Sequence, residues 1–371
     1  MQEFSVIPKI VQMNDCEELC VQFKIGCDDL IITSRHIFDD HIRLFCNGAQ
    51  TVFLRDFGKG EPTDVMVDAI ADSIKGRNFN RVIAIGGGSI LDVGKLFCLK
   101  TVAPVCGLFC GNIIPQRDKE LIMVPTTCGT GSEVTNISIL ELTELNTKKG
   151  LAVSEIYANY AVLIPNLLKD LPFEVFATSS IDAFIHCIEA YLSPKATSFT
   201  KLFSIKGIQT IIKGYIKIAQ EGSIARYSML EDFLLASTYA GIAFGNAGCA
   251  AVHALSYPLG AICHVPHGES NYAMFAGVFD KYKQLKPTGE LDRLEYTLAK
   301  QLGCDKENVY VELASLLTHI IPKKSLHEYG VHVEELKEFA ASVMKNQQRL
   351  LSNNYTQFTE SDILDIYSNL Y

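Results

Sequence analysis

The sequence predicts an α/β domain with a parallel, doubly wound sheet, followed by an all-α domain. Up to about residue 165, short apolar runs alternate with amphipathic stretches, as in strand–helix–strand units. After Asn166 strand signals nearly disappear, and long stretches of helical apolar periodicity follow. A chain of 371 residues also suits two hydrophobic cores better than one. We therefore expect domains at 1–165 and 166–371, divided within Leu163-Ile164-Pro165-Asn166.

The first domain is expected to alternate strands and helices. The apolar runs predict strands at 30–33, 51–54, 81–85 and 121–124, and helices at 65–74 and 90–99. Val65, Ala69 and Ile70 fall on one side of the first helix, and Pro125 stops the last strand. This order indicates parallel strands.

The second domain is expected to be helical throughout. Its periodic stretches are 174–192, 198–220, 227–245, 250–258, 289–302, 307–320, 333–351 and 360–370. The most polar segments, 280–296 and 322–336, are expected to be surface loops. No internal repeat or low-complexity segment is present.

Composition excludes several classes of function. The net charge of −9 and the lack of a Lys/Arg cluster argue against a nucleic-acid partner. The N-terminus lacks the pattern of a signal peptide, and no apolar run reaches the length of a membrane span. We therefore expect a cytoplasmic protein with no membrane partner. Its 12 cysteines are expected to be reduced, because the missing signal peptide argues for a reducing compartment, and to be mostly small core residues. No C-x2-C pair suggests a zinc ribbon or an iron–sulfur cluster.

Two segments well separated in the chain form the strongest candidate site. Asp182 and His186 are four residues apart, which places both on one face of a helix. His253 and His267 lie on either side of Pro258 and Gly260, so the chain is expected to turn between them and bring both imidazoles to one point. One carboxylate and three imidazoles suit a divalent transition metal with positions left open. The pattern indicates a catalytic metal rather than a structural one.

The alternative is an ordinary structural role for each of these residues. Nine histidines make some clustering inevitable, and an Asp-x-x-x-His pair on a helix is usually a surface pair or a cap. The surroundings of Asp182 and His253 favour the metal, because both segments are mostly apolar. A charge placed there is costly unless it is paired or metal-bound.

A glycine-rich loop, Gly86-Gly87-Gly88-Ser89, follows the predicted strand 81–85 and opens the next helix. Backbone amides at a helix N-terminus bind anions, and glycines let a phosphate approach closely, so we predict a nucleotide pyrophosphate here. The loop fits neither the Walker A pattern nor G-x-G-x-x-G. The alternative is a plain glycine turn.

A second loop of small residues, 125–133, follows the strand 121–124. Because ligands bind at the carboxyl ends of parallel strands, both loops are expected at the same sheet edge. The alternative is a helix N-cap at Thr130 or Ser132 with no ligand.

Four segments together resemble the iron-containing (group III) alcohol dehydrogenase family. They are GGGSILDVGK at 86–95, PTTCGTGSEVT at 125–135, DAFIHCIEAY at 182–191 and HALSYPLGAICHVPHG at 253–268. Their order and spacing also match, and the similarity covers most of the chain. The resemblance implies a Rossmann-like dinucleotide-binding domain plus a helical domain, the architecture that dehydroquinate synthase shares. It also implies a homodimer.

The resemblance assigns site residues one by one. It implies that Asp182, His186, His253 and His267 bind the metal, usually Fe2+ and sometimes Zn2+. It also implies that the cofactor loops comprise Gly86, Gly87, Gly88, Ser89, Asp92, Thr126, Thr127 and Thr130.

Two positions depart from the family pattern. Tyr257 stands where many members have a histidine that helps to move the proton, and a phenol is a good donor but a poor base at neutral pH. We therefore name Tyr257 and His264 as candidate catalytic residues. Thr33-Ser34-Arg35 lacks the carboxylate that NAD-preferring members often carry, and Arg35 could pair with a 2′-phosphate. We expect NAD, with NADP as the open alternative.

Tyr257 and the segment after His264 resemble the 4-hydroxybutyrate dehydrogenase branch of the family. The hypothesis is reversible hydride transfer between NAD(H) and 4-hydroxybutyrate or succinate semialdehyde. Lys148, Lys149 and Tyr257 are candidate anchors for the substrate carboxylate. The alternatives are a dehydrogenase for simple primary alcohols or 1,3-propanediol, a metal-dependent lyase of the dehydroquinate synthase type, and a non-catalytic binding protein.

Overall fold

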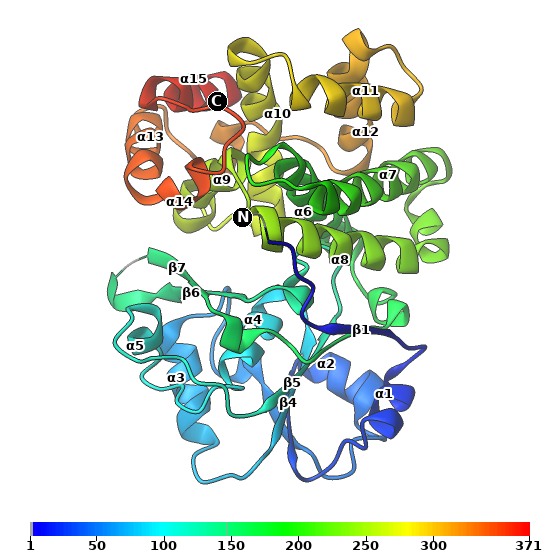
Figure 1. The fold of residues 1–371 in the computed structure, drawn as a ribbon, viewed down its shortest axis with the longest axis vertical. Coiled ribbons are helices and arrows are strands. Elements are labelled where there is room, and N and C mark those ends of the chain that lie inside the picture. Colours follow the sequence, from blue (N-terminus) through cyan, green and yellow to red (C-terminus); the bar gives the residue numbers. More distant parts are fainter. Residues whose placement is uncertain (1–2, 146) are drawn as a thin grey trace. The chain divides into compact units, whose positions relative to one another are not determined.

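The computed structural model describes residues 3–145 and 147–371 and divides them into two compact units. One unit is Val6–Asp170, drawn from blue to green in Figure 1. The other is Leu171–Tyr371 together with residues 3–5. The division falls five residues beyond the expected boundary after residue 165.

The first unit is built on a six-stranded sheet in which every strand pair is parallel. Its strands in spatial order are β1 (Lys9–Gln12), β8 (Tyr160–Leu163), β5 (Glu120–Pro125), β4 (Arg81–Gly86), β2 (Asp29–Thr33) and β3 (Gln50–Phe53). The four strands predicted from the sequence are confirmed, with no end shifted by more than one residue. The sequence analysis did not predict β1 and β8.

Apolar residues cover both faces of this sheet. Leu30 and Ile32 of β2 pack into one core, and Ile31 between them packs into another. The first core contains residues of α3 (Asp64–Ser73), α4 (Gly88–Leu96) and α5 (Val105–Phe109). The second contains α1 (Cys16–Gln22) and Ile42 of the π-helical turn Phe38–Ile42, which follows the short α2 (Arg35–Ile37). The doubly wound sheet is therefore confirmed.

An antiparallel hairpin of β6 (Ile137–Leu142) and β7 (Thr147–Ala152) was missed by the sequence analysis. β7 is polar and mostly exposed, so it lacks the apolar run of a buried strand. The predicted helix 90–99 is displaced: α4 begins within the glycine loop at Gly88 and ends at Leu96.

The second unit is helical, as predicted. Its helices are α6 (Phe173–Leu192), α7 (Ser198–Glu221), α8 (Leu230–Ala247), α9 (Ala251–Ile262), α10 (His267–Leu285), α11 (Glu290–Leu302), α12 (Val309–Ile320), α13 (Glu335–Asn346), α14 (Gln348–Leu351) and α15 (Glu360–Leu370). The loop expected at 280–296 is wrong, because α10 and α11 occupy all of it except 286–289. Most of α10 is buried, so tertiary packing rather than local pattern forms this polar helix.

The predicted turn at Pro258 and Gly260 is also wrong. α9 continues through both residues to Ile262, and Pro258 is buried inside it. The break before α10 falls at 263–266, where His264 has a φ of 55°. A proline inside a helix is unfavourable by about 3 kcal/mol, so burial of the apolar α9 must outweigh that penalty.

Two further expectations concern thiols and membranes. The described residues form no disulfide, but only six of the 12 cysteines are buried, so the expectation that most are core residues is too broad. None of the helices in the described ranges is by itself long and apolar enough to cross a membrane. α8 and α9 together are long and apolar enough for a membrane span by length and composition, but the chain bends by 106° between them.

Candidate metal centre and cofactor loops

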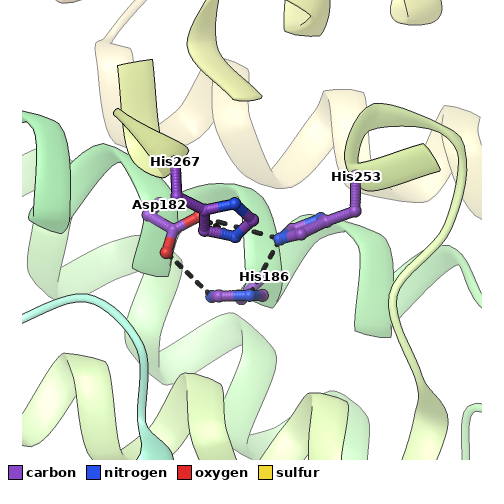
Figure 2. Close-up of side chains that lie close together, drawn as sticks. All are labelled: Asp182, His186, His253 and His267. Atoms are coloured by element: carbon purple, nitrogen blue, oxygen red, sulfur yellow. Dashed lines mark hydrogen bonds and ion pairs between the residues drawn. The ribbon is translucent and has the colours of Figure 1, made fainter. Parts of the chain in front are cut away.

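Three helices bring the four predicted metal ligands together (Figure 2). Asp182 and His186 project from one face of α6. His253 lies in the first turn of α9, and His267 is the first residue of α10. One ligand atom from each residue lies within 4.8 Å of all the others.

The ring nitrogens and the carboxylate converge closely. His186 Nε2 lies 2.9 Å from His253 Nε2. Asp182 Oδ1 lies 3.7 Å from His253 Nε2 and 3.8 Å from His267 Nε2. His186 is also stacked on Phe244, with ring centroids 4.2 Å apart, which fixes its plane.

Burial and charge make this cluster suited to a cation. Asp182, His186 and His253 are buried, whereas the side chain of His267 is 35% exposed. Burial alone would raise the pKa of Asp182, but the imidazoles of His186, His267 and His253 hold it well below its usual range. Burial would lower the pKa of His253, but the Glu189 charge and hydrogen bonds to Asp182 and Glu189 raise it to about 9.

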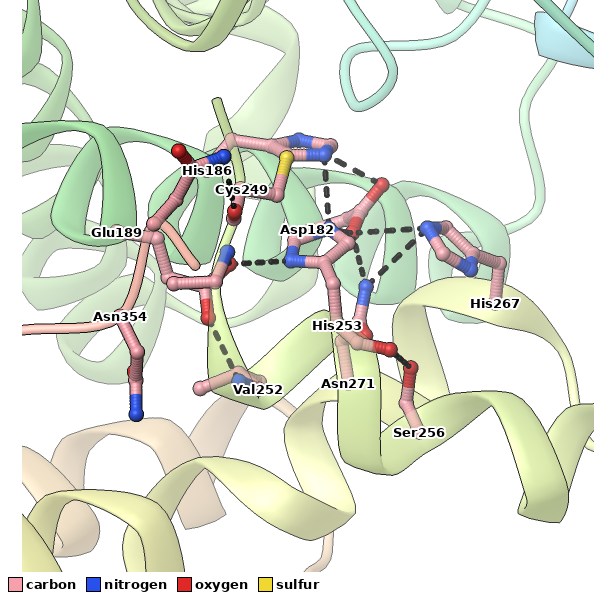
Figure 3. A network of polar contacts seen from close by, with 12 residues as sticks. Asp182, His186, Glu189, Cys249, Val252, His253, Ser256, His267, Asn271 and Asn354 are labelled. Carbon is pink, nitrogen blue, oxygen red and sulfur yellow. Dashed lines mark hydrogen bonds and ion pairs between the residues drawn. The ribbon is translucent and has the colours of Figure 1, made fainter. Parts of the chain in front are cut away.

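A second carboxylate, Glu189, orients His253 from behind (Figure 3). Glu189 accepts a hydrogen bond of 2.6 Å from His253 Nδ1, and also accepts from the backbone N–H groups of Ala250 and Val252. A carboxylate that accepts from Nδ1 places the proton there and leaves the Nε2 lone pair of a neutral ring facing the cluster. The same contacts satisfy amides at the start of α9.

Asn271 supports the opposite side of the cluster. Its Nδ2 donates to Asp182 Oδ1 at 2.7 Å and lies 3.2 Å from His267 Nε2. The sequence analysis missed both Glu189 and Asn271. Glu189 carried the signal used for Asp182, a carboxylate in an apolar helix, whereas Asn271 became recognisable only once 267–285 was known to be helical.

Gly268 allows the first turn of α10 to approach α6. A Cβ at this position would lie 2.2 Å from the carbonyl oxygen of Thr178 and 3.3 Å from Asp182 Cβ. The first distance is shorter than any real contact, so only glycine lets His267 come this close to Asp182.

The donor set fits a divalent transition ion. It comprises one carboxylate oxygen and three imidazole nitrogens, with two buried carboxylates, Asp182 and Glu189, balancing the charge. No cysteine belongs to this four-residue set, and His267 leaves one side accessible, as a catalytic site needs. The set does not separate iron from zinc.

In the sheet unit, the two predicted cofactor loops are in contact. Gly87 and Gly88 begin α4 directly after β4. A Cβ on Gly88 would lie 2.7 Å from Thr130 Cγ2, and one on Gly87 would lie 3.2 Å from Thr127 Cγ2. Both loops therefore lie at the same sheet edge, as predicted. Thr130 Oγ1 lies 3.4 Å from Ser132 N, but only a three-residue 3-10 turn follows, so no full helix is capped there.

A buried network lies beneath these loops. Lys95 is 0% exposed, and its Nζ donates to Ser132 Oγ, Thr135 Oγ1 and the Ile137 carbonyl, and pairs with Asp92. Burial lowers the pKa of Lys95, and Asp92 opposes that shift. Asp92 also accepts from Ser132 Oγ at 2.6 Å and from the Ile139 amide at 3.0 Å. Asp92, which the family resemblance assigns to the cofactor loop, is therefore bound by protein groups through hydrogen bonds and an ion pair.

The predicted catalytic residues lie near His253 in sequence but differ in setting. Tyr257 is half-buried, one helical turn after His253 on the same face of α9. His264 is exposed in the break between α9 and α10. Of the proposed anchors, Lys148 pairs with Glu61 at 2.9 Å, and Lys149 is exposed.

A glycine-rich loop between a parallel strand and a helix suits a nucleotide, and the helical unit offers a divalent-ion site. The class that the fold and these sites define is a metal-dependent, nucleotide-linked enzyme. Family models agree: residues 11–165 match "Iron-containing alcohol dehydrogenase", and residues 176–371 match "Fe-containing alcohol dehydrogenase family, C-terminal".

Individual relatives point the same way. The chain is 45% identical to the 4-hydroxybutyrate dehydrogenase of Clostridium kluyveri over 100% of both chains. It is 32% identical to the long-chain-alcohol dehydrogenase 1 of Geobacillus thermodenitrificans, over 82% of this chain and 78% of that one. The sulfoacetaldehyde reductase of Bifidobacterium kashiwanohense, solved with NAD+, has the same fold, with a TM-score of 0.85 and 22% identity over 100% of this chain and 98% of that one. The chain belongs to the iron-containing alcohol dehydrogenase family.

Proposed function

We propose that this enzyme transfers a hydride reversibly between NAD(H) and 4-hydroxybutyrate, interconverting the alcohol with succinate semialdehyde. The observation that carries the proposal is the convergence of Asp182, His186, His253 and His267. The substrate follows from the end-to-end similarity to the Clostridium kluyveri enzyme.

Each part of the site has a defined task in this reaction. A divalent ion, which we propose to be Fe2+, would be held by the four converging side chains and supply Lewis acidity toward the reacting oxygen. NAD would supply the hydride acceptor, and the amides at Gly87 and Gly88 would bind its pyrophosphate. Glu189 holds His253 in the ligating tautomer, and Lys95 with Asp92 supports the second loop.

The proton of the alcohol needs a path of its own. Tyr257 is the first candidate, because its phenol is on the same helix face as His253 and is partly accessible. His264 is exposed and would act through water. The substrate carboxylate needs a donor, for which Lys148, Lys149 and Tyr257 remain the proposed groups.

The test is NADH oxidation, followed at 340 nm, by protein loaded anaerobically with Fe(II) or, separately, with Zn(II). We expect a strong preference for succinate semialdehyde over butanal and 3-hydroxypropanal. His267→Ala should lose both the bound metal and the activity, because it removes one of four ligands. His332→Ala, which removes an exposed imidazole from the same unit, is the matched control and should change neither.

Equal or faster turnover of the neutral aldehydes would keep the family and refute the hydroxy-acid substrate. We also propose a homodimer, which light scattering would show as twice the chain mass of 41.0 kDa.

A further inference from the structure

An ion pair lies at the carboxyl ends of two neighbouring strands of the sheet. Arg35 follows β2, and Asp56 ends the 3-10 turn Leu54–Asp56 after β3. Arg35 Nη2 donates to Asp56 Oδ2 at 2.6 Å. The guanidinium carbon also lies 4.4 Å from the centroid of the Phe53 ring. The two side chains are 64% and 43% exposed, so a ligand can reach them.

This pair is close to the first cofactor loop. β2 lies beside β4, with Ile32 opposite Ala84, so Ser34 stands level with Gly86 about 5 Å away. Thr33 Oγ1 donates to the Ile85 carbonyl at 2.8 Å and fixes the two strand ends together. In sheets that bind dinucleotides, the adenosine ribose lies beside the glycine-loop strand. There a carboxylate accepts from the ribose 2′-OH, or an arginine binds a 2′-phosphate.

The strand end itself carries a neutral side chain. Ser34 Oγ is buried and makes no hydrogen bond within the described residues, and the strand end presents no carboxylate to a ribose hydroxyl. The cation that would attract a 2′-phosphate is Arg35, and its charge is already met by Asp56. A 2′-phosphate at this place would therefore meet the Asp56 carboxylate and would have to separate the pair.

We propose that Asp56 determines the cofactor preference: by holding Arg35 and placing a negative charge beside the ribose, it favours NAD(H) over NADP(H). The inference rests on the proposed function only in assuming that the glycine loop binds a dinucleotide. Phe53 stacks against Arg35, so the guanidinium stays at the sheet edge when Asp56 is neutralised. Asp56→Asn therefore turns Arg35 into a ligand for the 2′-phosphate.

The experiment is a fluorescence titration of NADH and NADPH, without substrate, against metal-loaded protein. We expect the wild type to bind NADH more tightly. Asp56→Asn should strengthen NADPH binding about tenfold, the worth of one charge-assisted hydrogen bond, and leave NADH within about twofold. Arg35→Ala added to Asp56→Asn should cancel the gain, and salt should weaken it.

The matched control is Asp118→Asn. Asp118 also pairs with an adjacent cation, Lys119, but it precedes β5 at the amino edge of the same sheet. The same loss of one negative charge there should leave both cofactors unaffected.

Three outcomes would overturn the inference: a wild type that prefers NADPH, an Asp56→Asn protein with an unchanged preference, or a gain that survives Arg35→Ala. If the wild type binds neither cofactor, the proposed function itself fails. If it binds NADH and oxidises it with the semialdehyde while Asp56→Asn changes nothing, only the role of Asp56 is refuted.

Discussion

The metal centre and the cofactor edge, the sheet edge that carries the two predicted cofactor loops, are built from different kinds of groups. The metal centre consists of polar side chains from three helices, and buried hydrogen bonds between Glu189 and His253 and between Asn271 and Asp182 hold two of them in place. The cofactor edge consists of backbone and small residues, and its key property is the missing Cβ at Gly87 and Gly88. The first should therefore be sensitive to loss of a polar partner, and the second to gain of volume.

The largest expected effect is an exception to this contrast, because the charged side chain of Lys95 also supports the cofactor edge. Lys95→Met should lower the free energy of unfolding by about 3–5 kcal/mol, since it removes one member of a buried pair and leaves Asp92 and three oxygen acceptors. Urea unfolding measures the loss, and NADH affinity should fall with it. Lys119→Met, at a more exposed pair, should cost less than about 1 kcal/mol. Equal losses in the two variants would contradict the role of Lys95.

The next effect sharpens the contrast at the metal centre. Glu189→Gln keeps the size of the side chain but can donate to His253 Nδ1, which would move the ring proton to Nε2. We expect metal affinity to fall about 10–100-fold, as measured by competition with a chelator. Glu174→Gln, at the exposed start of α6, is the control. Unchanged metal affinity in Glu189→Gln would show that the tautomer of His253 is set elsewhere.

The pH dependence of the same variant gives an independent check. The pKa of His253 is raised from 6.5 to about 9. In protein freed of metal by a chelator, the His253 proton therefore stabilises the fold fully below pH 6.5, and this stabilisation is lost as the pH rises through 9. The free energy of unfolding of the metal-free protein should fall by about 3 kcal/mol across this range, because each pH unit between the two pKa values contributes about 1.36 kcal/mol. Glu189→Gln should flatten this profile. Metal affinity should change in the opposite direction, rising with pH, because the ion competes with that proton.

The last comparison makes the same substitution, glycine to alanine, in the two regions. Gly268→Ala places a methyl against the backbone carbonyl of Thr178, which cannot rotate away, whereas Gly88→Ala meets the Thr130 methyl, which can. Overpacking of this kind costs about 1–3 kcal/mol, and we expect Gly268→Ala at the upper end and Gly88→Ala at the lower. Gly268→Ala should weaken metal binding only, and Gly88→Ala NADH binding only. Gly26→Ala, with ordinary 3.7 Å contacts, should change neither.

The sequence was sufficient wherever the signal was local. An apolar run predicts a buried parallel strand such as Arg81–Gly86. The four-residue spacing of Asp182 and His186 predicts that both lie on one helix face. The two cofactor loops could be placed at one edge because all parallel strands end there.

The sequence failed where tertiary packing overrides local preference. Pro258 marks a turn by its chemistry, yet burial keeps it inside α9. The start of α10 is polar, so local pattern does not predict this helix, which forms by packing against its neighbours. The contact of Asn271 with Asp182 was missed for the same reason. The partner of Arg35 was not predictable either, because Asp56 comes from a different strand end, 21 residues away.

The contacts of Glu189 also bear on how the ion arrives. Because protein groups already fix the start of α9 and the orientation of the His253 ring, the receptor for the ion is shaped during folding and not during loading. Loading then needs only the release of the His253 proton, and it can be reversed and repeated without unfolding. Since a nitrogen and oxygen receptor binds first-row divalent ions in the order of their intrinsic affinities, in which Fe2+ is not the strongest, the metal pool in which the enzyme matures decides its occupant.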